Sequence, residues 1–114
     1  MNNDFDSSLE KAMSVLNRAK NFGTRIRFVF AHDTFGNFGL DGKVEELEEK
    51  HWLFRGADCL AYIDWSTCKL SAVEDVHITG SEFSFLWHFK LGGENFFSVS
   101  GIEPLPPEPS GLVN

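Results

Sequence analysis

Basic residues are scarce in this chain, whose 114 residues include 10 Lys and Arg against 17 Asp and Glu, a formal net charge of −7. Proteins that bind nucleic acid through its phosphates need clustered Lys and Arg. The pair formed by Arg25 and Arg27 is too small a cluster for this. We therefore expect no nucleic-acid partner. We attribute the acidic balance to solubility or, less often, to a basic protein partner.

Cysteine is also rare, with Cys59 and Cys68 as the two examples. One possible pair is not a disulfide framework, and the spacing is not that of a Cys-x-x-Cys motif. We expect reduced thiols, with Cys59 in the core and Cys68 near the surface. The N-terminus lacks signal-peptide features, and no apolar run approaches the roughly 20 residues that span a bilayer. These absences predict a soluble, cytoplasmic protein with no membrane partner.

Motifs of the common catalytic and cofactor sites are missing. There is no Gly-x-Ser-x-Gly, P-loop or dinucleotide fingerprint. His51, His77 and His88 are of a metal-binding type, but no pair has zinc-finger or zincin spacing. Cys68, beside Lys69, is at most a reactive thiol. We therefore name no catalytic residue, no metal site and no cofactor, and favour a non-enzymatic protein over an enzyme.

Phenylalanine is abundant, with 12 residues in a chain that is 42% hydrophobic. Aromatic residues favour strands and bury large areas. A chain of this length forms one domain and can bury a core without disulfides or metals. We expect one α+β domain over 1–103, with a helix at 7–21 and a β-rich part at 25–101. A flexible Pro-rich tail should follow at 104–114.

Residues 7–21 have the periodicity of an amphipathic helix. The apolar residues expected to be buried on one face are Leu9, Met13 and Leu16. Ser7 and Glu10 fit a capping box, in which each side chain accepts a hydrogen bond from the other residue's backbone N–H. Gly23 is a natural end to the helix, because glycine readily adopts the left-handed conformation found there.

Period-two alternation predicts strands after residue 24. The segments with this pattern are 25–30, 58–65, 73–79 and the two arms of 82–100. The segment 43–56 is ambiguous: we favour a hairpin that turns near 48–50, and a short helix over 43–50 is the alternative. We expect a strongly curved antiparallel sheet or a small SH3-like or Sm-like barrel of about five to seven strands. It should end in a Gly-Gly hairpin and the Pro-rich tail.

The segment 31–42, AHDTFGNFGLDG, is so rich in turn-forming residues that we expect it to break regular structure. His32 and Asp33 resemble a base and its orienter, but neighbours on an extended chain point to opposite faces and should not pair. We expect His32 to end a strand and Asp33 to cap a turn. Phe35 and Phe38 either contact a ligand or partner or fold back onto the core. The candidate contact residues are thus Phe35, Phe38, His32 and Asp33.

The segment 82–100 predicts a hairpin with a two-residue Gly92-Gly93 turn. That turn sets Phe89 opposite Phe96 and gives both faces of the hairpin apolar residues. One uncovered apolar face would favour self-association, as a homodimer or small homo-oligomer. The candidate interface residues are Leu86, Trp87, His88, Phe97 and Val99. His88 is either a buried structural histidine or a group that titrates near neutral pH.

Three functions are compatible with these patterns. The first is a small interaction module that self-associates through an aromatic-rich sheet surface. The second is an acidic inhibitor or immunity-type protein that binds a basic enzyme, with the acidic run 45–49 as its surface. The third is a protein with a small-molecule pocket between the helix and the curved sheet.

Overall fold

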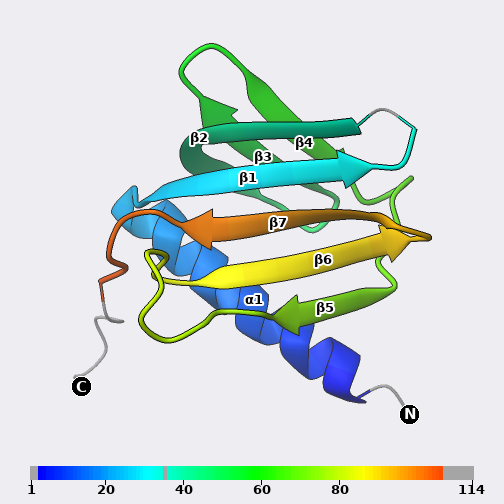
Figure 1. The fold of residues 1–114 in the computed structure, drawn as a ribbon, viewed down its shortest axis with the longest axis horizontal. Helices are drawn as coiled ribbons and strands as arrows, with labels where there is room; N and C mark the ends of the chain where they lie inside the picture. The colour runs from blue at the N-terminus through cyan, green and yellow to red at the C-terminus, as the bar shows by residue number, and fades with distance from the viewer. Residues whose placement is uncertain (1–2, 35, 107–114) are drawn as a thin grey trace.

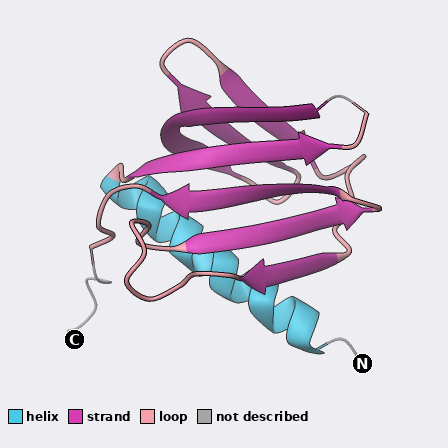
Figure 2. Cartoon of the chain, viewed as in Figure 1, coloured by secondary structure: helices cyan, strands magenta, loops and turns pink. Residues whose placement is uncertain are grey.

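The computed structural model describes residues 3–34 and 36–106, and these residues form one helix and seven strands (Figures 1 and 2). The elements are α1 (Asn3–Phe22), β1 (Arg25–His32), β2 (Gly36–Leu47), β3 (His51–Gly56), β4 (Leu60–Asp64), β5 (Ala72–Asp75), β6 (Leu86–Gly92) and β7 (Asn95–Gly101). Most of the Pro-rich tail, residues 107–114, lies outside the described residues.

The strands form one antiparallel sheet in the order β4-β3-β2-β1-β7-β6-β5. Its edges are β4 and β5, so the described strands make an open sheet and not a closed barrel. Figure 1 shows β2 bending, with β3 and β4 turned away from the direction of β1 and α1 crossing behind the lower strands. The fold is therefore α+β, with one helix on one face of an open, curved sheet.

The helix begins at Asn3, earlier than the predicted residue 7. Ser7 and Glu10 consequently lie inside it, where backbone N–H groups already have helical partners, so the predicted capping box is wrong. On the predicted apolar face, Leu16 is fully buried, whereas Leu9 and Met13 are half-buried. The C-terminal half of the helix is therefore the part most deeply packed on the sheet.

The helix ends as predicted, at a glycine in the left-handed conformation. Gly23 has a φ of 64°. Its N–H donates to the carbonyl oxygen of Lys20 at 3.2 Å, and the N–H of Thr24 donates to that of Ala19 at 2.9 Å. These two bonds form a Schellman motif, which satisfies carbonyl groups that would otherwise lack helical partners. The motif turns the chain directly into β1.

The core lies between α1 and the inner face of the sheet, which we define as the face that α1 covers. Strand alternation places large apolar residues there, and the buried ones are Ile26, Phe28, Leu40, Val44, Trp52, Phe54, Ile63, Val73, Trp87, Phe89, Phe97 and Val99. The centre is aromatic: the ring of Phe97 lies 4.6 Å from that of Phe89 and 5.5 Å from that of Phe28. Close-packed rings of this kind contribute large buried areas.

The segment 31–42 contains a turn at residues 33 and 34, but its glycine-rich part does not break regular structure, contrary to the prediction. Residues 36–42 belong to β2, which pairs with β1 and β3. Gly42 faces Gly56, and a Cβ atom on Gly42 would lie 1.9 Å from the carbonyl oxygen of Arg55. Glycine in a strand marks such a close backbone approach. The glycines therefore allow the bend of the sheet instead of ending a strand.

The ambiguous segment 43–56 forms the hairpin that we favoured. Strand β2 runs to Leu47, β3 starts at His51, and residues 48–50 make the turn. The alternative, a short helix over 43–50, is wrong. Glutamate-rich helix propensity is a weak preference, and pairing of Val44 with Phe54 in the sheet buries both side chains.

The hairpin of β6 and β7 has a different register from the predicted one. Its turn residues are Gly93 and Glu94 instead of Gly92 and Gly93, and the ladder shifts between Lys90 and Gly92. Phe89 therefore faces Phe97, not Phe96. A one-residue shift moves a strand's side chains to the opposite face. Phe97 consequently points into the core, and Phe96 points outward.

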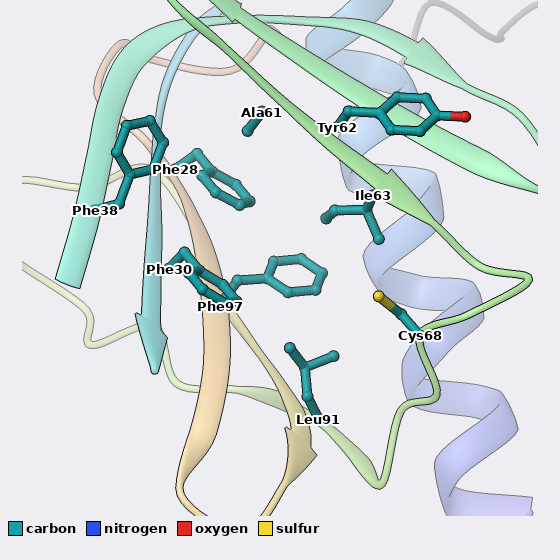
Figure 3. Close-up of a pocket in the computed structure, with 9 residues that line it drawn as sticks. All are labelled: Phe28, Phe30, Phe38, Ala61, Tyr62, Ile63, Cys68, Leu91 and Phe97. Carbon is teal, nitrogen blue, oxygen red and sulfur yellow. The ribbon is translucent and has the colours of Figure 1, made fainter. Parts of the chain in front are cut away.

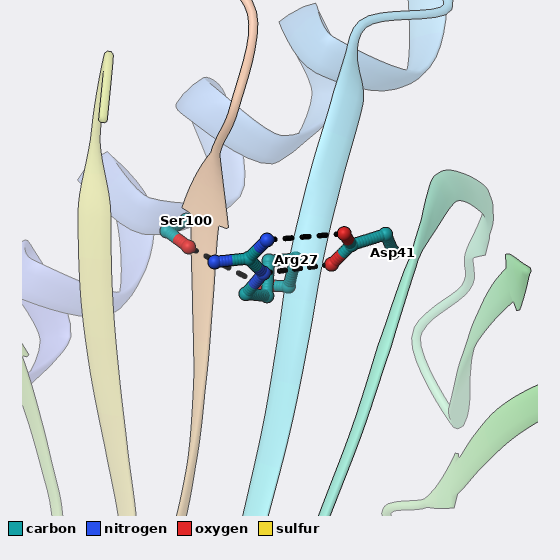
Figure 4. Close-up of polar contacts among 3 residues, drawn as sticks. All are labelled: Arg27, Asp41 and Ser100. Atoms are coloured by element: carbon teal, nitrogen blue, oxygen red, sulfur yellow. Dashed lines mark hydrogen bonds and ion pairs between the residues drawn. The ribbon is translucent and has the colours of Figure 1, made fainter. Parts of the chain in front are cut away.

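On the outer face, an ion pair links β1 to β2 (Figure 4). Arg27 Nε lies 2.7 Å from Asp41 Oδ1, and the two residues are direct partners in the ladder. The hydrogen bond from Arg27 holds the pKa of Asp41 below its usual value. Both side chains are exposed, so water screens the pair, which contributes at most about 1 kcal/mol. Burial on the inner face is the larger stabilising effect.

We predict that Leu16→Ala lowers the free energy of unfolding by about 2–5 kcal/mol, because it leaves a cavity at a fully buried site. Met13→Ala should cost clearly less, since Met13 is half-buried. Urea denaturation followed by circular dichroism measures both. Equal losses in the two variants would contradict the packing described here.

A second stability prediction concerns the bend. Gly42→Ala should destabilise by at least about 2 kcal/mol, because the new methyl group collides with the backbone of β3. Gly39→Ala is the matched control: its Cβ would lie 3.4 Å from the Phe28 carbonyl oxygen, an ordinary contact. Thermal denaturation of both variants tests this, and a tolerated alanine at 42 would show that close approach does not shape β2.

Candidate functional site

A cavity of about 330 Å³ lies on the inner face of the sheet, beside the part that α1 covers (Figure 3). Its lining residues are Phe28, Phe30, Phe38, Ala61, Tyr62, Ile63, Cys68, Leu91 and Phe97. They come from β1, β2, β4, β6, β7 and the segment after β4, and none of these nine comes from the helix. The sheet alone therefore encloses most of this space by curving around it.

Strand pairing explains why the aromatic residues converge. Phe30 on β1 has Phe38 of β2 on one side and Phe97 of β7 on the other. Residues directly opposite in an antiparallel ladder point to the same face. One wall of the cavity is therefore a continuous row of three phenylalanines across three strands.

The opposite wall comes from the edge of the sheet. Alternation in β4 turns Ala61 and Ile63 inward, and Cys68 follows from the segment after that strand. Figure 3 shows the Cys68 sulfur pointing toward the cavity from the side of the helix. Ala61 is the smallest lining side chain, and its size leaves part of the space open.

The chemistry of this cavity is that of apolar contact. Among its nine lining residues, none has a carboxylate, amine or guanidinium group, and the polar side-chain groups are the Tyr62 hydroxyl and the Cys68 thiol. Tyr62 is 58% exposed, so it borders the mouth. General acid–base chemistry needs a positioned titratable pair, which this lining does not supply. The cavity can bind an apolar group by removing its surface from water.

The first predicted contact set is only partly at the cavity. Phe38 lines it and is 44% exposed, whereas Phe35 lies outside the described residues. His32 ends β1, as predicted, and Asp33 follows in the turn. Of the four residues, the structure thus brings Phe38 to the candidate site.

The predicted geometry of His32 and Asp33 is wrong in one respect. The two side chains do approach, with His32 Nδ1 3.5 Å from Asp33 Oδ1, because Asp33 leaves the strand and enters the turn. The N–H of Thr34 donates to the same His32 Nδ1 at 3.0 Å. The histidine ring thus caps the turn, in the role that we assigned to Asp33.

The second predicted set, the interface residues, does not form one surface. Trp87, Phe97 and Val99 are buried in the core on the inner face, whereas Leu86 and His88 are half-buried on the outer face. The shifted register of the hairpin is the reason. Self-association stays a prediction, and these five residues do not provide a surface for it.

Cys59 differs from its predicted position in the core. Cys59 is exposed, because it lies before β4 begins and so outside the alternation that we extended to it. Cys68 is half-buried and lines the cavity. Alternation indicated that Ala61 and Ile63 face inward, but no signal in the sequence brings Cys68, Leu91 and Phe30 to one place.

Two residues of the acidic run 45–49 have polar partners on β3. Glu45 forms an ion pair with Arg55, and Glu46 Oε1 lies 2.6 Å from His51 Nε2. Glu48 and Glu49, in the turn, are exposed. The run is therefore less of a uniform acidic surface than its sequence suggests.

The pKa of His88 lies below the ordinary value of 6.5, chiefly because burial disfavours its charged form. Its ring stacks on Phe96, with centroids 4.1 Å apart. The unfolded chain therefore takes up this proton more readily than the folded one. The associated loss of stability begins as pH falls through the ordinary pKa and continues toward the lowered one.

We accordingly predict that wild type loses more stability between pH 7.5 and pH 5.5 than His88→Gln does. Urea denaturation at the two pH values measures the difference, and other titrating groups cancel in the comparison. The same pH dependence in both proteins would contradict a depressed pKa at His88.

Within the described part of the chain, no helix is long and apolar enough to cross a membrane. The same residues contain no group of three or more His, Cys, Asp or Glu placed to hold a metal ion. Comparison with known proteins finds no matching family model, curated protein or solved structure.

Proposed function

We propose that this protein binds a small apolar molecule in the cavity on the inner face of its sheet. The observation that carries the proposal is the lining: nine residues enclose about 330 Å³ without one charged side chain among them. Ligand pockets in proteins span roughly 300–1,000 Å³ and are mainly apolar. A cavity at the lower end of that range suits a compact aromatic or aliphatic group.

The shape of the fold supports binding over catalysis. The row of Phe30, Phe38 and Phe97 offers ring faces and edges, which contact apolar ligands over large areas. The half-exposed Phe38 and Tyr62 border the opening, so a ligand can enter without unfolding of the core. The proposal thus keeps the aromatic contact that we expected from the sequence. It assigns that contact to a concave site instead of a flat interface.

The neutral fluorescent probe N-phenyl-1-naphthylamine tests this function. We expect its fluorescence to rise on mixing with wild type, in a saturable titration. Ala61→Phe should weaken binding at least about tenfold, because the new ring fills the cavity, a loss of about 1.4 kcal/mol or more. Fluorescence titration with a thermal-denaturation check of each variant gives the result.

Ala57→Phe is the matched control, since it makes the same change at an exposed turn residue outside this cavity. It should leave the dissociation constant within about twofold. Absence of saturable binding to folded wild type, or equal binding by Ala61→Phe, would refute the proposed function.

A further inference from the structure

A second cavity, of about 450 Å³, lies on the other side of Cys68. Its lining residues are Leu9, Met13, Glu48, Glu49, Trp52, Trp65, Cys68, Lys69 and Leu70. They come from the first half and the middle of α1, the β2–β3 turn, β3 and the segment after β4. This space therefore lies where the curled sheet edge meets the half-buried Leu9 and Met13 of the helix.

The two cavities adjoin. Cys68 lines both of them, and it is a small, half-buried side chain. The ring of Phe97, in the first cavity, lies 6.2 Å from that of Trp65 and 6.3 Å from that of Trp52, in the second. The two spaces therefore meet at Cys68 and share an aromatic wall.

The cavities differ in polarity. The first has no charged lining residue among its nine, whereas the second has Glu48, Glu49 and Lys69, all exposed. An elongated ligand can therefore keep a charged end in water at the second cavity while its apolar end occupies the first. Burying the charged end in the first cavity would cost its hydration without a partner.

We propose that the ligand is an elongated amphiphile, with its apolar tail in the first cavity, its chain passing Cys68, and a cationic head at the outer edge of the second. This inference rests on the proposed function and specifies its ligand class. Two carboxylates against one amine favour a positive head, and the net charge of −7 acts in the same direction. Trp65 also lines this cavity, and tryptophan rings attract quaternary ammonium groups.

Tetradecyltrimethylammonium, used below its critical micelle concentration, is the test ligand, and N-phenyl-1-naphthylamine is the short probe. Leu70→Trp, which places a bulky indole in the second cavity, should weaken binding of the long ligand at least about tenfold and leave the affinity for the short probe within twofold. Ala61→Phe should weaken the binding of both ligands. Calorimetric and fluorescence titrations measure the four affinities.

The outcomes separate the two proposals. If the short probe binds and Leu70→Trp does not weaken binding of the long ligand, the elongated ligand is wrong and the proposed function stands. If neither molecule binds folded wild type, both proposals fail. If tetradecyl sulfate binds as tightly as the ammonium compound, the cationic head is wrong. The exposed carboxylates repel an anionic head and should weaken its binding at least about tenfold.

Thiol labelling of wild type gives a second readout that does not depend on the folding of a variant. Iodoacetamide alkylates accessible thiols, and the exposed Cys59 serves as an internal control in the same molecule. Saturating tetradecyltrimethylammonium should slow labelling of Cys68 at least about tenfold and leave Cys59 unchanged, as followed by peptide mass spectrometry. Unchanged labelling of Cys68 at saturation would show that the chain does not pass it.

Discussion

A single α-helix must cover the inner face of a seven-stranded sheet, and it is too narrow to do so. A helix of 20 residues is about 30 Å long but only about 10 Å wide. Six strand spacings of about 4.8 Å give a sheet nearly as wide as the helix is long. The helix packs on β2 and β5, so the apolar residues of β3 and β4, which lie beyond β2 in the sheet, need further cover. Curvature of the sheet supplies it.

The bend depends on residues that look unsuited to a sheet. Gly42 and Gly56 face each other across β2 and β3, where no larger residue fits at position 42. Beyond this point β2 continues to Leu47, and β3 returns Trp52 and Phe54 to the core. Bending lets β3 and β4 fold over the aromatic centre, but they do not fill all the space that they enclose. The two cavities are the volume that this arrangement leaves.

Much of the fold follows from local patterns in the sequence. Period-two alternation around Phe28 and Phe30, the Gly23 helix end and the turn at 48–50 are local, and the structure has all of them. Pairing is not local. One irregular residue near Leu91 shifts the β6–β7 ladder and exchanges the positions of Phe96 and Phe97. Since the cavity needs Phe97 beside Phe30, no pattern within one strand could have predicted it.

The other large error of the sequence prediction was the loop expected over 31–42, and it arose for the same reason: strand pairing is not local. The density of glycine in 31–42 favours a loop when each residue is judged alone, because glycine weakens an isolated strand. In the sheet, β2 has ladder partners on both sides, and Gly42 faces the backbone of β3 at close approach. The missing side chain at this position allows the curvature, and the curvature brings Ala61 and Ile63 of an edge strand opposite the phenylalanines of central strands. The residues that made the segment look irregular are thus the ones that make a concave apolar site possible.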